Sequence, residues 1–351
     1  MFLGNLYDDD LNYAADGLPC ELFDKKSVLV TGATGMIGSC IVDILLKMVS
    51  KYQLDISIFA TGRSLERLNK RFDYALNIPN LHFLEMDLAS ASISDFSADF
   101  IIHAASSADP VSFAKEPVNI MMANILGTKN LIETGRRNHL QRFVYISSGE
   151  IYGQPNETMD DFVESYSGFL DYSSPRSCYP SAKRATEVLC QSYISQYDLD
   201  CVIARPCHIF GPTLTTSDSR AASEFIRSAA NGKDIVLKSA GLVERSHCYV
   251  VDAAQAILFL LIHGEKGQAY NISDTKYQMT IRDFAQQAAN AGNCQLIFSN
   301  PSDLEQKGYS KITRQVLSAG KIKNLGWEPR LSPTSNIAKS VDILKLAQTQ
   351  A

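Results

Sequence analysis

The stretch VLVTGATGMIG at residues 28–38 constrains the fold more than any other part of the sequence. A short apolar run ends at Gly32, and Gly35 and Gly38 accompany the start of a helical pattern over residues 36–49. Glycines at this spacing allow a tight turn and let backbone N–H groups approach a pyrophosphate at a helix N-terminus. The stretch predicts the strand, loop and helix of a dinucleotide-binding domain, although a glycine-rich turn without a ligand has the same pattern.

Downstream of this loop, apolar strand-like runs alternate with amphipathic helix-like runs. Nearly continuous apolar strands separated by helices are typical of a parallel sheet with helices on both faces. After Pro206, proline and glycine become frequent and the alternation is lost. We therefore expect an α/β fold, a doubly wound parallel sheet with a smaller C-terminal α/β domain that binds the substrate.

The same pattern predicts the domain boundaries. Residues 1–24 form an acidic N-terminal extension, and residues 25–205 form the dinucleotide-binding domain. The apolar run within about 245–265 returns to that domain, whereas about 206–244 and 266–351 form the substrate-binding domain. Three placements are open for the extension: across the sheet domain, over a cleft, or without fixed structure.

Composition argues against several classes of protein. The chain has 351 residues, a formal net charge of −5 and no basic block, which argues against a nucleic-acid-binding surface. Its apolar runs are too short to span a membrane, and its N-terminus lacks the features of a secretory signal. The eight cysteines are scattered without metal-ligand spacing, so we expect reduced thiols, no bound metal and a cytoplasmic location.

The end of the second expected strand bears on the choice of dinucleotide. An acidic residue about 20 residues past the glycines would hold the adenosine ribose of NAD. The chain has Gly62 at that place and Arg63 after it. Arg63 could bind the 2′-phosphate of NADP, or it could extend its charge into solvent at a strand end. Asp87 could touch the adenine or cap a following helix.

The stretch CYPSAK places Tyr179 four residues before Lys183, so both lie on one face of the predicted helix. A phenol has a pKa of ~10, which a nearby ammonium and a cationic nicotinamide would lower. Such a tyrosine can accept a proton from a sugar hydroxyl while hydride leaves the carbon. Pro180 fits only the first turn of a helix, which places Tyr179 at the helix start. The spacing alone arises often by chance.

A strand-like stretch before this helix, RFVYISSGEIYG, carries further candidates. Its two serines, Ser147 and Ser148, could merely end the strand, or one hydroxyl could hydrogen-bond the substrate oxygen that Tyr179 deprotonates. Glu150 could remove a proton or orient a water, or it could lie in a solvated loop.

Several motifs occur in the order of one enzyme family: TGATGMIG, IIHAAS, NILGT, SSGEIYG, the tyrosine–lysine spacing, ARPCHIFGP, ERSHCYVVDAA and NLGWEP. From about residue 25 to 345 the chain resembles the extended short-chain dehydrogenases/reductases, the NAD-dependent epimerase/dehydratase family of nucleotide-sugar enzymes. The resemblance implies a Rossmann fold, NAD as cofactor, a nucleotide-sugar substrate and a role in polysaccharide biosynthesis. It also implies a homodimer formed through two helices, here roughly 115–136 and 179–197.

The resemblance implies a role for each matching residue. The implied catalytic residues are Ser148, Glu150, Tyr179 and Lys183. The implied cofactor-binding residues are Gly32, Thr34, Gly35, Met36, Ile37, Gly38, Arg63, Asp87, Leu88, Ala104, Ala105, Ser106, Tyr179, Lys183 and Pro206. The implied substrate-binding residues are Ser148, Arg176, His208, Arg220 and Arg245, of which the last matches an arginine that contacts the nucleotide diphosphate.

The implied chemistry is oxidation at sugar C4 to a 4-keto intermediate, whose fate the motifs leave open. Glu150 and the run PRSCY, which contains Arg176, are similar to those of UDP-glucuronate decarboxylases, so a decarboxylase-like reaction is the first expectation. A 4,6-dehydratase or a 4-epimerase is the alternative. Gly149 stands where one dehydratase group has an acid, which argues against that group only. His208 stands where many relatives have an asparagine that binds the sugar phosphate.

Two alternatives lie outside this chemistry. An NADPH-dependent reductase that releases its cofactor is favoured by Arg63. A non-catalytic dinucleotide-binding protein would be favoured if Ser148, Tyr179 or Lys183 were missing, and all three are present.

Overall fold

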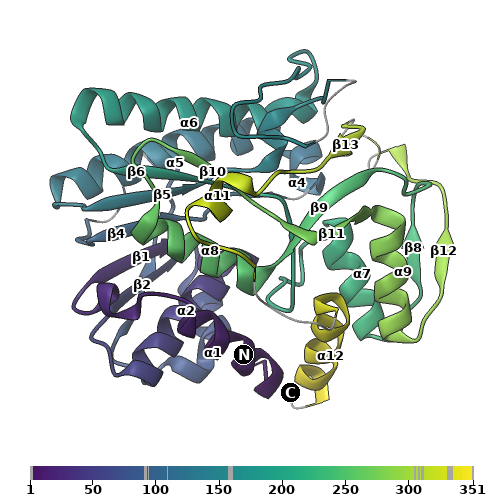
Figure 1. Cartoon of the computed structure of the whole chain (residues 1–351), viewed down its shortest axis with the longest axis horizontal. Coiled ribbons are helices and arrows are strands. Elements are labelled where there is room, and N and C mark those ends of the chain that lie inside the picture. Colours follow the sequence, from purple (N-terminus) through teal and green to yellow (C-terminus); the bar gives the residue numbers. More distant parts are fainter. Residues whose placement is uncertain are drawn as a thin grey trace.

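The structure is a computed structural model that describes residues 3–90, 93, 95–108, 110–156, 161–303, 306, 309, 312–329 and 335–349. Within these residues a large parallel sheet with helices on both faces lies beside a smaller α/β unit (Figure 1). No helix in these ranges has the length and apolar character needed to cross a bilayer.

The large sheet is parallel throughout, with the strand order β10-β6-β5-β4-β1-β2-β3 over the described part of the chain. The order reverses between β1 and β4, and in sheets of this kind ligands bind outside the carboxyl ends of the strands at such a switch point. This arrangement confirms the predicted doubly wound sheet. The strands are β1 (Ser27–Thr31), β2 (Ser57–Gly62), β3 (Leu81–Glu85), β4 (Phe100–His103), β5 (Arg142–Ile146), β6 (Cys201–Pro206) and β10 (Ala269–Ile272).

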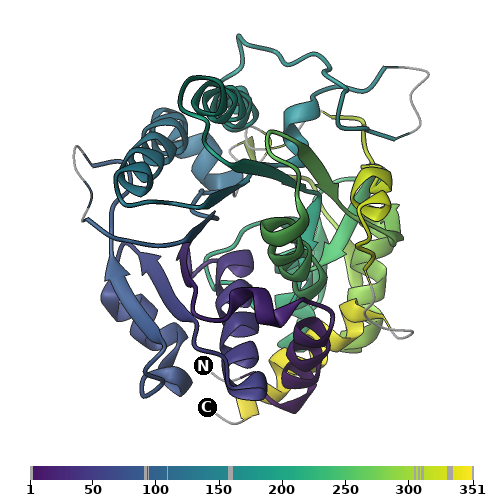
Figure 2. The same cartoon turned by 60° about the vertical axis from the view of Figure 1, so that its left-hand side comes forward.

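Two helical layers cover this sheet because alternate side chains of each strand point to opposite faces. Val28 and Val30 of β1 are buried in the core on one face, and Leu29 is buried in the core on the other. Figure 2 shows the two layers on either side of the sheet. The first layer contains α2 (Met36–Tyr52) and α8 (Val250–His263), and the second contains α5 (Pro117–Arg137) and α6 (Cys178–Tyr197).

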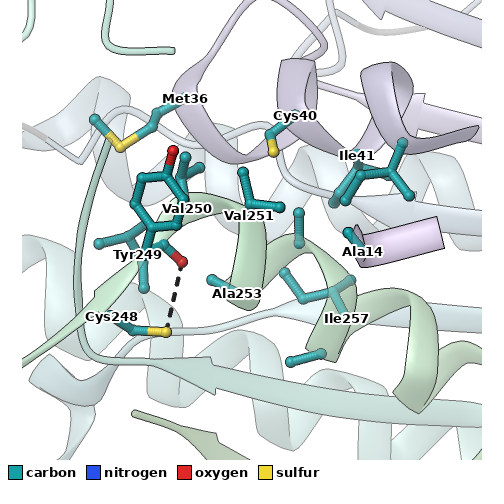
Figure 3. Close-up of a cluster of buried hydrophobic side chains, with 14 of the residues drawn as sticks. Ala14, Met36, Cys40, Ile41, Cys248, Tyr249, Val250, Val251, Ala253 and Ile257 are labelled. Carbon is teal, nitrogen blue, oxygen red and sulfur yellow. Dashed lines mark hydrogen bonds between the residues drawn. The ribbon is translucent and has the colours of Figure 1, made fainter. Parts of the chain in front are cut away.

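The N-terminal extension forms a helix, α1 (Asn5–Asp16), that packs against α2 and α8. Figure 3 shows Ala14 of α1, Ile41 of α2 and Ile257 of α8 in one cluster of apolar side chains. The amide of Gln255 on α8 donates a hydrogen bond to the carbonyl oxygen of Ala14 at 3.0 Å. Of the three placements left open by the sequence, the structure therefore shows the one against the sheet domain.

The smaller unit contains two short sheets and three helices in its described part. β7 (His208–Phe210), β9 (Glu244–Tyr249), β11 (Asp274–Thr280) and β13 (Arg314–Gln315) form one sheet, and β8 (Ile235–Leu237) pairs with β12 (Leu296–Phe298). The helices are α7 (Ala221–Ala230), α9 (Ile281–Gly292) and α12 (Asn336–Thr349). Phe210 and Phe284 are buried where this sheet meets α9.

Two domain boundaries differ from the sequence prediction. β10 was assigned to the substrate domain within 266–351, but it pairs in parallel with β6 and extends the large sheet. β9 lies mostly within the segment 245–265 assigned to the sheet domain, but it pairs with β11, β7 and β13 in the small sheet. Only α8 of that segment returns to the large sheet. Strand pairing of this kind depends on contacts between distant segments, which short apolar runs do not specify.

Candidate active site

The glycine loop between β1 and α2 has the backbone geometry that a pyrophosphate site needs. Gly32 has φ 64°, and a Cβ atom on it would lie 2.8 Å from the Cα atom of Ala105. A Cβ atom on Gly38 would lie 2.4 Å from the carbonyl oxygen of Gly32. Gly35 precedes α2 without a side-chain cap, so no side chain there competes for the first N–H groups of the helix. These N–H groups and the helix dipole fit the pyrophosphate of NAD.

A cleft of about 330 Å³ brings together this loop and the predicted catalytic residues. It lies along the carboxyl ends of β1, β4 and β5, as expected for a doubly wound sheet. The predicted site residues that line it are Gly32, Thr34, Gly35, Met36, Ile37, Gly38, Arg63, Ala104, Ser106, Ser148, Glu150, Tyr179, Lys183, Pro206, His208 and Arg220.

Five predicted site residues are not part of the cleft lining. Asp87 is exposed, and its carboxylate accepts the backbone N–H of Ala89 at 3.1 Å, so it caps a turn. Leu88 lies against Gly127 of α5, where the absence of a side chain makes room for it. The other three lie elsewhere: Ala105 beside Gly32, Arg176 beside Glu150, and Arg245 on β9.

Tyr179 is buried at the start of α6, in the first turn as Pro180 predicted. Burial raises the pKa of Tyr179 to about 12, and the charge of Glu150 adds to this rise. A hydrogen bond with Ser148 and the charges of Arg220 and Arg176 act in the opposite direction on that pKa. The predicted lowering of the phenol pKa by Lys183 is not seen with the protein groups alone, because desolvation of the phenolate outweighs the nearby positive charges.

Lys183 lies one turn along α6, with its Nζ atom 5.8 Å from the centre of the Tyr179 ring. The Nζ atom donates a hydrogen bond to the carbonyl oxygen of Ile146 at 2.8 Å, which anchors it to the end of β5. Burial lowers the pKa of Lys183 to about 7, although the charge of Glu187 partly offsets this effect. The Nζ atom of Lys183 is therefore held at the cleft by a backbone carbonyl.

Ser148 and Glu150 lie where β5 runs into a short 3-10 turn, Gly149–Tyr152. The hydroxyl of Ser148 accepts the backbone N–H of Glu150 at 3.1 Å, which fixes the turn. The carboxylate of Glu150 forms an ion pair with Arg176 at 3.0 Å, and both side chains are largely buried. The two residues were predicted to act separately, and the structure pairs them.

Two residues that the sequence did not single out contact predicted site residues, and of these Gln315 lines the cleft. Phe113 is buried on α4 (Pro110–Lys115), and its ring stacks on that of Tyr179 with 4.8 Å between centres. Gln315 of β13 accepts a hydrogen bond from Nε2 of His208 at 2.9 Å. Neither residue belongs to a motif, and only the fold brings it to the site.

His208, Arg220 and Asp218 line the substrate side of the cleft. Burial and the charge of Arg245 lower the pKa of His208 well below its usual value, so His208 is neutral near pH 7. Arg220 donates to both carboxylate oxygens of Asp218, with the shortest contact at 2.6 Å. His208 therefore contributes hydrogen-bonding atoms and no charge, and the charge of Arg220 is offset by Asp218.

Two buried polar atoms near the cleft have no hydrogen-bond partner in the described part of the chain, the Ser147 hydroxyl oxygen and Nε of Arg245. Buried polar groups in proteins are almost always paired, so orphaned atoms at a cleft mark places that a ligand satisfies. Ser147 lines the cleft, and Arg245 belongs to β9. Both atoms suit a ligand rich in hydroxyl and phosphate oxygens.

A buried histidine holds the floor of the cleft in place. His103 at the end of β4 lies between the hydroxyls of Thr31 and Thr128, at 2.8 and 3.0 Å. Thr128 donates to the carbonyl oxygen of Asn124, and Thr31 accepts the N–H of Ala105, so His103 donates through Nε2 and accepts at Nδ1. Burial lowers the pKa of His103 to about 3. His103 is thus a neutral bridge between β1, β4 and α5.

The sequence matches the model of the NAD dependent epimerase/dehydratase family over residues 28–273, well over half of the chain. The chain belongs to this family. This membership confirms the predicted family and its NAD dependence.

Curated relatives within the epimerase/dehydratase family carry two kinds of activity in their names. UDP-glucuronic acid decarboxylase 6 of Arabidopsis thaliana is 28% identical over 87% of this chain and 84% of that protein. The dTDP-D-glucose 4,6-dehydratase of Homo sapiens is 26% identical over 90% of this chain and 89% of that protein.

Solved structures of family enzymes share the fold. DesIV, a dTDP-glucose 4,6-dehydratase from Streptomyces venezuelae, superposes with a TM-score of 0.78 at 22% identity and covers 92% of this chain and 98% of its own. UDP-glucose 4-epimerase from Thermotoga maritima superposes with a TM-score of 0.75 at 20% identity and covers 93% of this chain and 100% of its own. At these identities the comparison shows the shared Rossmann architecture.

Proposed function

We propose that this member of the epimerase/dehydratase family oxidises a nucleotide sugar at C4, with Tyr179 as the base. The observation that supports this most is the convergence of Tyr179, Ser148 and Lys183 on the cleft that the glycine loop also lines. Tyr179 takes the proton of the C4 hydroxyl, and Ser148 hydrogen-bonds the same oxygen. NAD, when bound, supplies the hydride acceptor and a positive charge that favours the phenolate form of Tyr179.

We further propose that the substrate is a UDP-glucuronate-like uronic acid that loses CO2. Oxidation at C4 makes the C6 carboxylate a β-keto acid, so the C5–C6 bond breaks, its electron pair moves toward the C4 carbonyl, and C5 then gains a proton. The proposal is supported by the relatives named as decarboxylases and by Glu150 and Arg176, which match motifs of such enzymes. Arg220, which lines the cleft, and Arg245, whose buried Nε has no partner in the described part of the chain, suit a substrate with several negative charges.

Incubation with UDP-, dTDP-, GDP- and CDP-linked hexoses and uronates, followed by mass spectrometry, tests the reaction. Loss of CO2 from a uronate is the expected result. Loss of water would instead indicate a 4,6-dehydratase, and an unchanged mass with inverted C4 by NMR would indicate a 4-epimerase. No change with any of these substrates, in protein that binds NAD, would refute C4 oxidation.

Arg63 favours a second candidate, a reductase that uses NADPH. Its side chain is exposed and lines the cleft near the end of β2, where the chain lacks an acidic residue for the ribose. A reductase would consume added NADPH in proportion to product, whereas an enzyme that recycles NAD keeps it bound through desalting. Comparing NAD and NADP affinities of Arg63→Ala with those of the wild type separates the two candidates.

We infer that the protein forms a homodimer through α5 and α6. Val118 and Met122 of α5 and Val188 of α6 are 70%, 44% and 65% exposed, and together they place apolar surface on adjacent helices. A second copy of the same face would cover this surface. Light scattering should give a dimer for the wild type and a monomer for Val188→Asp. Leu242→Asp changes an equally exposed residue of the smaller unit and should leave the dimer intact.

A further inference from the structure

Arg176 lies directly before α6, in the 3-10 turn Pro175–Ser177, and it is held on two sides. On one side its Nη2 atom is 3.0 Å from both carboxylate oxygens of Glu150. On the other side the guanidinium carbon lies 4.6 Å from the centre of the Phe113 ring. The side chain is 13% exposed, so water competes little for these contacts.

Phe113 links Arg176 to Tyr179, because it contacts both side chains. Its ring contacts the Arg176 guanidinium and also stacks on the Tyr179 ring, 4.8 Å away with 26° between the planes. Both rings are buried. Movement of Arg176 would therefore loosen the aromatic contact that holds Tyr179 as well as the carboxylate of Glu150.

The charge around Tyr179 comes from several elements. Glu150 contributes a negative charge from the turn after β5, and it raises the pKa of Tyr179. Arg176 and Arg220 contribute positive charges from two other segments, and they lower it. Among the described residues, the titratable and charged groups that face Tyr179 are Glu150, Arg176, Arg220, Lys183 and Tyr145.

We propose that Arg176 is a positioning residue for the proposed C4 oxidation, which balances the charge of Glu150 beside Tyr179 and does not itself bind the substrate. The geometry supports this role because Glu150 lines the cleft, whereas Arg176 is not part of the lining and pairs with Glu150. The guanidinium of Arg176 thus offsets the negative charge that Glu150 presents to the cleft. The effect of Arg176 on catalysis rests on the proposed function. The charge balance between Arg176 and Glu150 does not, because it is a property of the protein itself.

The sign of the effect follows from the two charges. Without Arg176, the carboxylate of Glu150 disfavours the phenolate of Tyr179, so its ionisation moves to higher pH. Without Glu150, ionisation moves to lower pH. When both charges are removed, the two effects cancel in large part. A residue with only a structural role would not produce this reversal.

The variants Arg176→Met, Glu150→Gln and the double variant test this in protein loaded with NAD+. Isotope-labelled tyrosine reports ring ionisation by NMR, and the resonance missing from Tyr179→Phe identifies Tyr179. We expect the midpoint to rise by about one pH unit in Arg176→Met, to fall in Glu150→Gln and to return toward the wild-type value in the double variant. Arg176→Lys keeps the positive charge and should shift the midpoint less than Arg176→Met.

Arg142 provides a matched control. It forms a two-contact ion pair with Asp200 at 2.9 and 3.0 Å at the start of β5, the opposite end from the cleft. Arg142→Met should lower stability and leave the Tyr179 midpoint unchanged. Equal midpoints in the wild type, Arg176→Met and Glu150→Gln would overturn the proposal. This titration does not require turnover, so a wild type that converts no nucleotide sugar would refute the proposed function without deciding this result.

The same variants give a kinetic readout when the wild type is active. The rate of NAD reduction should rise with pH through the Tyr179 midpoint. In Arg176→Met this rise should move to higher pH by the same amount as the NMR midpoint, so the rate below it falls about tenfold for each unit. An altered KM with an unchanged pH profile would show instead that Arg176 binds the substrate, and would overturn the proposal.

Discussion

The buried carboxylate of Asp43 and the partly buried carboxylate of Glu150 have different surroundings. Asp43 of α2 accepts hydrogen bonds from Tyr7 of α1 at 2.7 Å and also from Tyr74 and Arg71. Glu150 lines the cleft and forms an ion pair with Arg176 close to Tyr179, the proposed base. The first carboxylate has donors on three sides and joins α1 to the sheet domain. The second lies at a cleft whose lining includes the unpartnered hydroxyl of Ser147, which a ligand could satisfy.

The comparison distinguishes residues that stabilise the fold from residues that we propose act on a substrate. A fully satisfied polar network in a low-dielectric interior stabilises one arrangement of the chain. Near the cleft, the unpartnered atoms of Ser147 and Arg245 are costly in the free protein, and a bound ligand repays that cost. Substitutions around Asp43 should therefore change stability, and substitutions around Tyr179 should change turnover.

The largest effect is expected at Tyr179. Tyr179→Phe removes the proposed base for the C4 hydroxyl proton, and the rate should fall by about 10²–10⁴-fold. The free energy of unfolding should change little, because the ring and its stack on Phe113 are kept. Single-turnover measurement of NAD reduction tests the expected fall in rate, and urea unfolding tests the expected stability. A large loss of stability with normal turnover would break the comparison.

Asp43→Ala is the converse substitution. It removes the acceptor that Arg71, Tyr74 and the buried Tyr7 share and breaks the ion pair with Arg71, so the protein should lose about 3–5 kcal/mol of stability. The variant should keep its kcat at temperatures where it stays folded, because Asp43 is not part of the cleft lining. Chemical denaturation and steady-state kinetics test this, and Asp16→Ala, at an exposed ion pair, serves as the control.

Buried histidines should make the protein sensitive to acid. Burial lowers the pKa of His103 to about 3 and that of His247 to about 4, whereas in the unfolded chain each takes up a proton near pH ~6.5. The unfolded state then binds more protons between these values, so stability falls as pH drops below ~6.5. Each histidine contributes about 1.4 kcal/mol per pH unit. Urea unfolding at pH 7 and pH 5 should show a smaller difference for His247→Gln than for the wild type.

The smallest effect is expected where α1 meets the smaller unit. Asp10 of α1 accepts from the Tyr249 hydroxyl at 2.9 Å and from Lys339 of α12 at 2.5 Å. Asp10→Asn should cost about 1–3 kcal/mol, since it leaves partners buried without a charged acceptor. A double-mutant cycle with Lys339→Met should give a favourable coupling energy. Additive effects would show that α1 is attached through its apolar face alone.

Local spacing explains what the sequence predicted well. The glycines of residues 32–38, the position of Pro180 and the spacing of Tyr179 and Lys183 act over a few residues, where backbone sterics and helix periodicity decide the outcome. The alternation of apolar runs was enough to predict the parallel sheet. It was not enough to place β10 and β9, whose short runs pair through distant contacts.

By itself, the sequence determined a Rossmann sheet, its glycine loop and the residues at the end of β5 and the start of α6. Only the tertiary structure decided that Glu150 pairs with Arg176, that Phe113 stacks on Tyr179 and that Gln315 holds His208. It also decided that Tyr179 has a raised pKa in the protein alone. The physical reason is that these properties depend on burial and on contacts between distant segments, which no local pattern encodes.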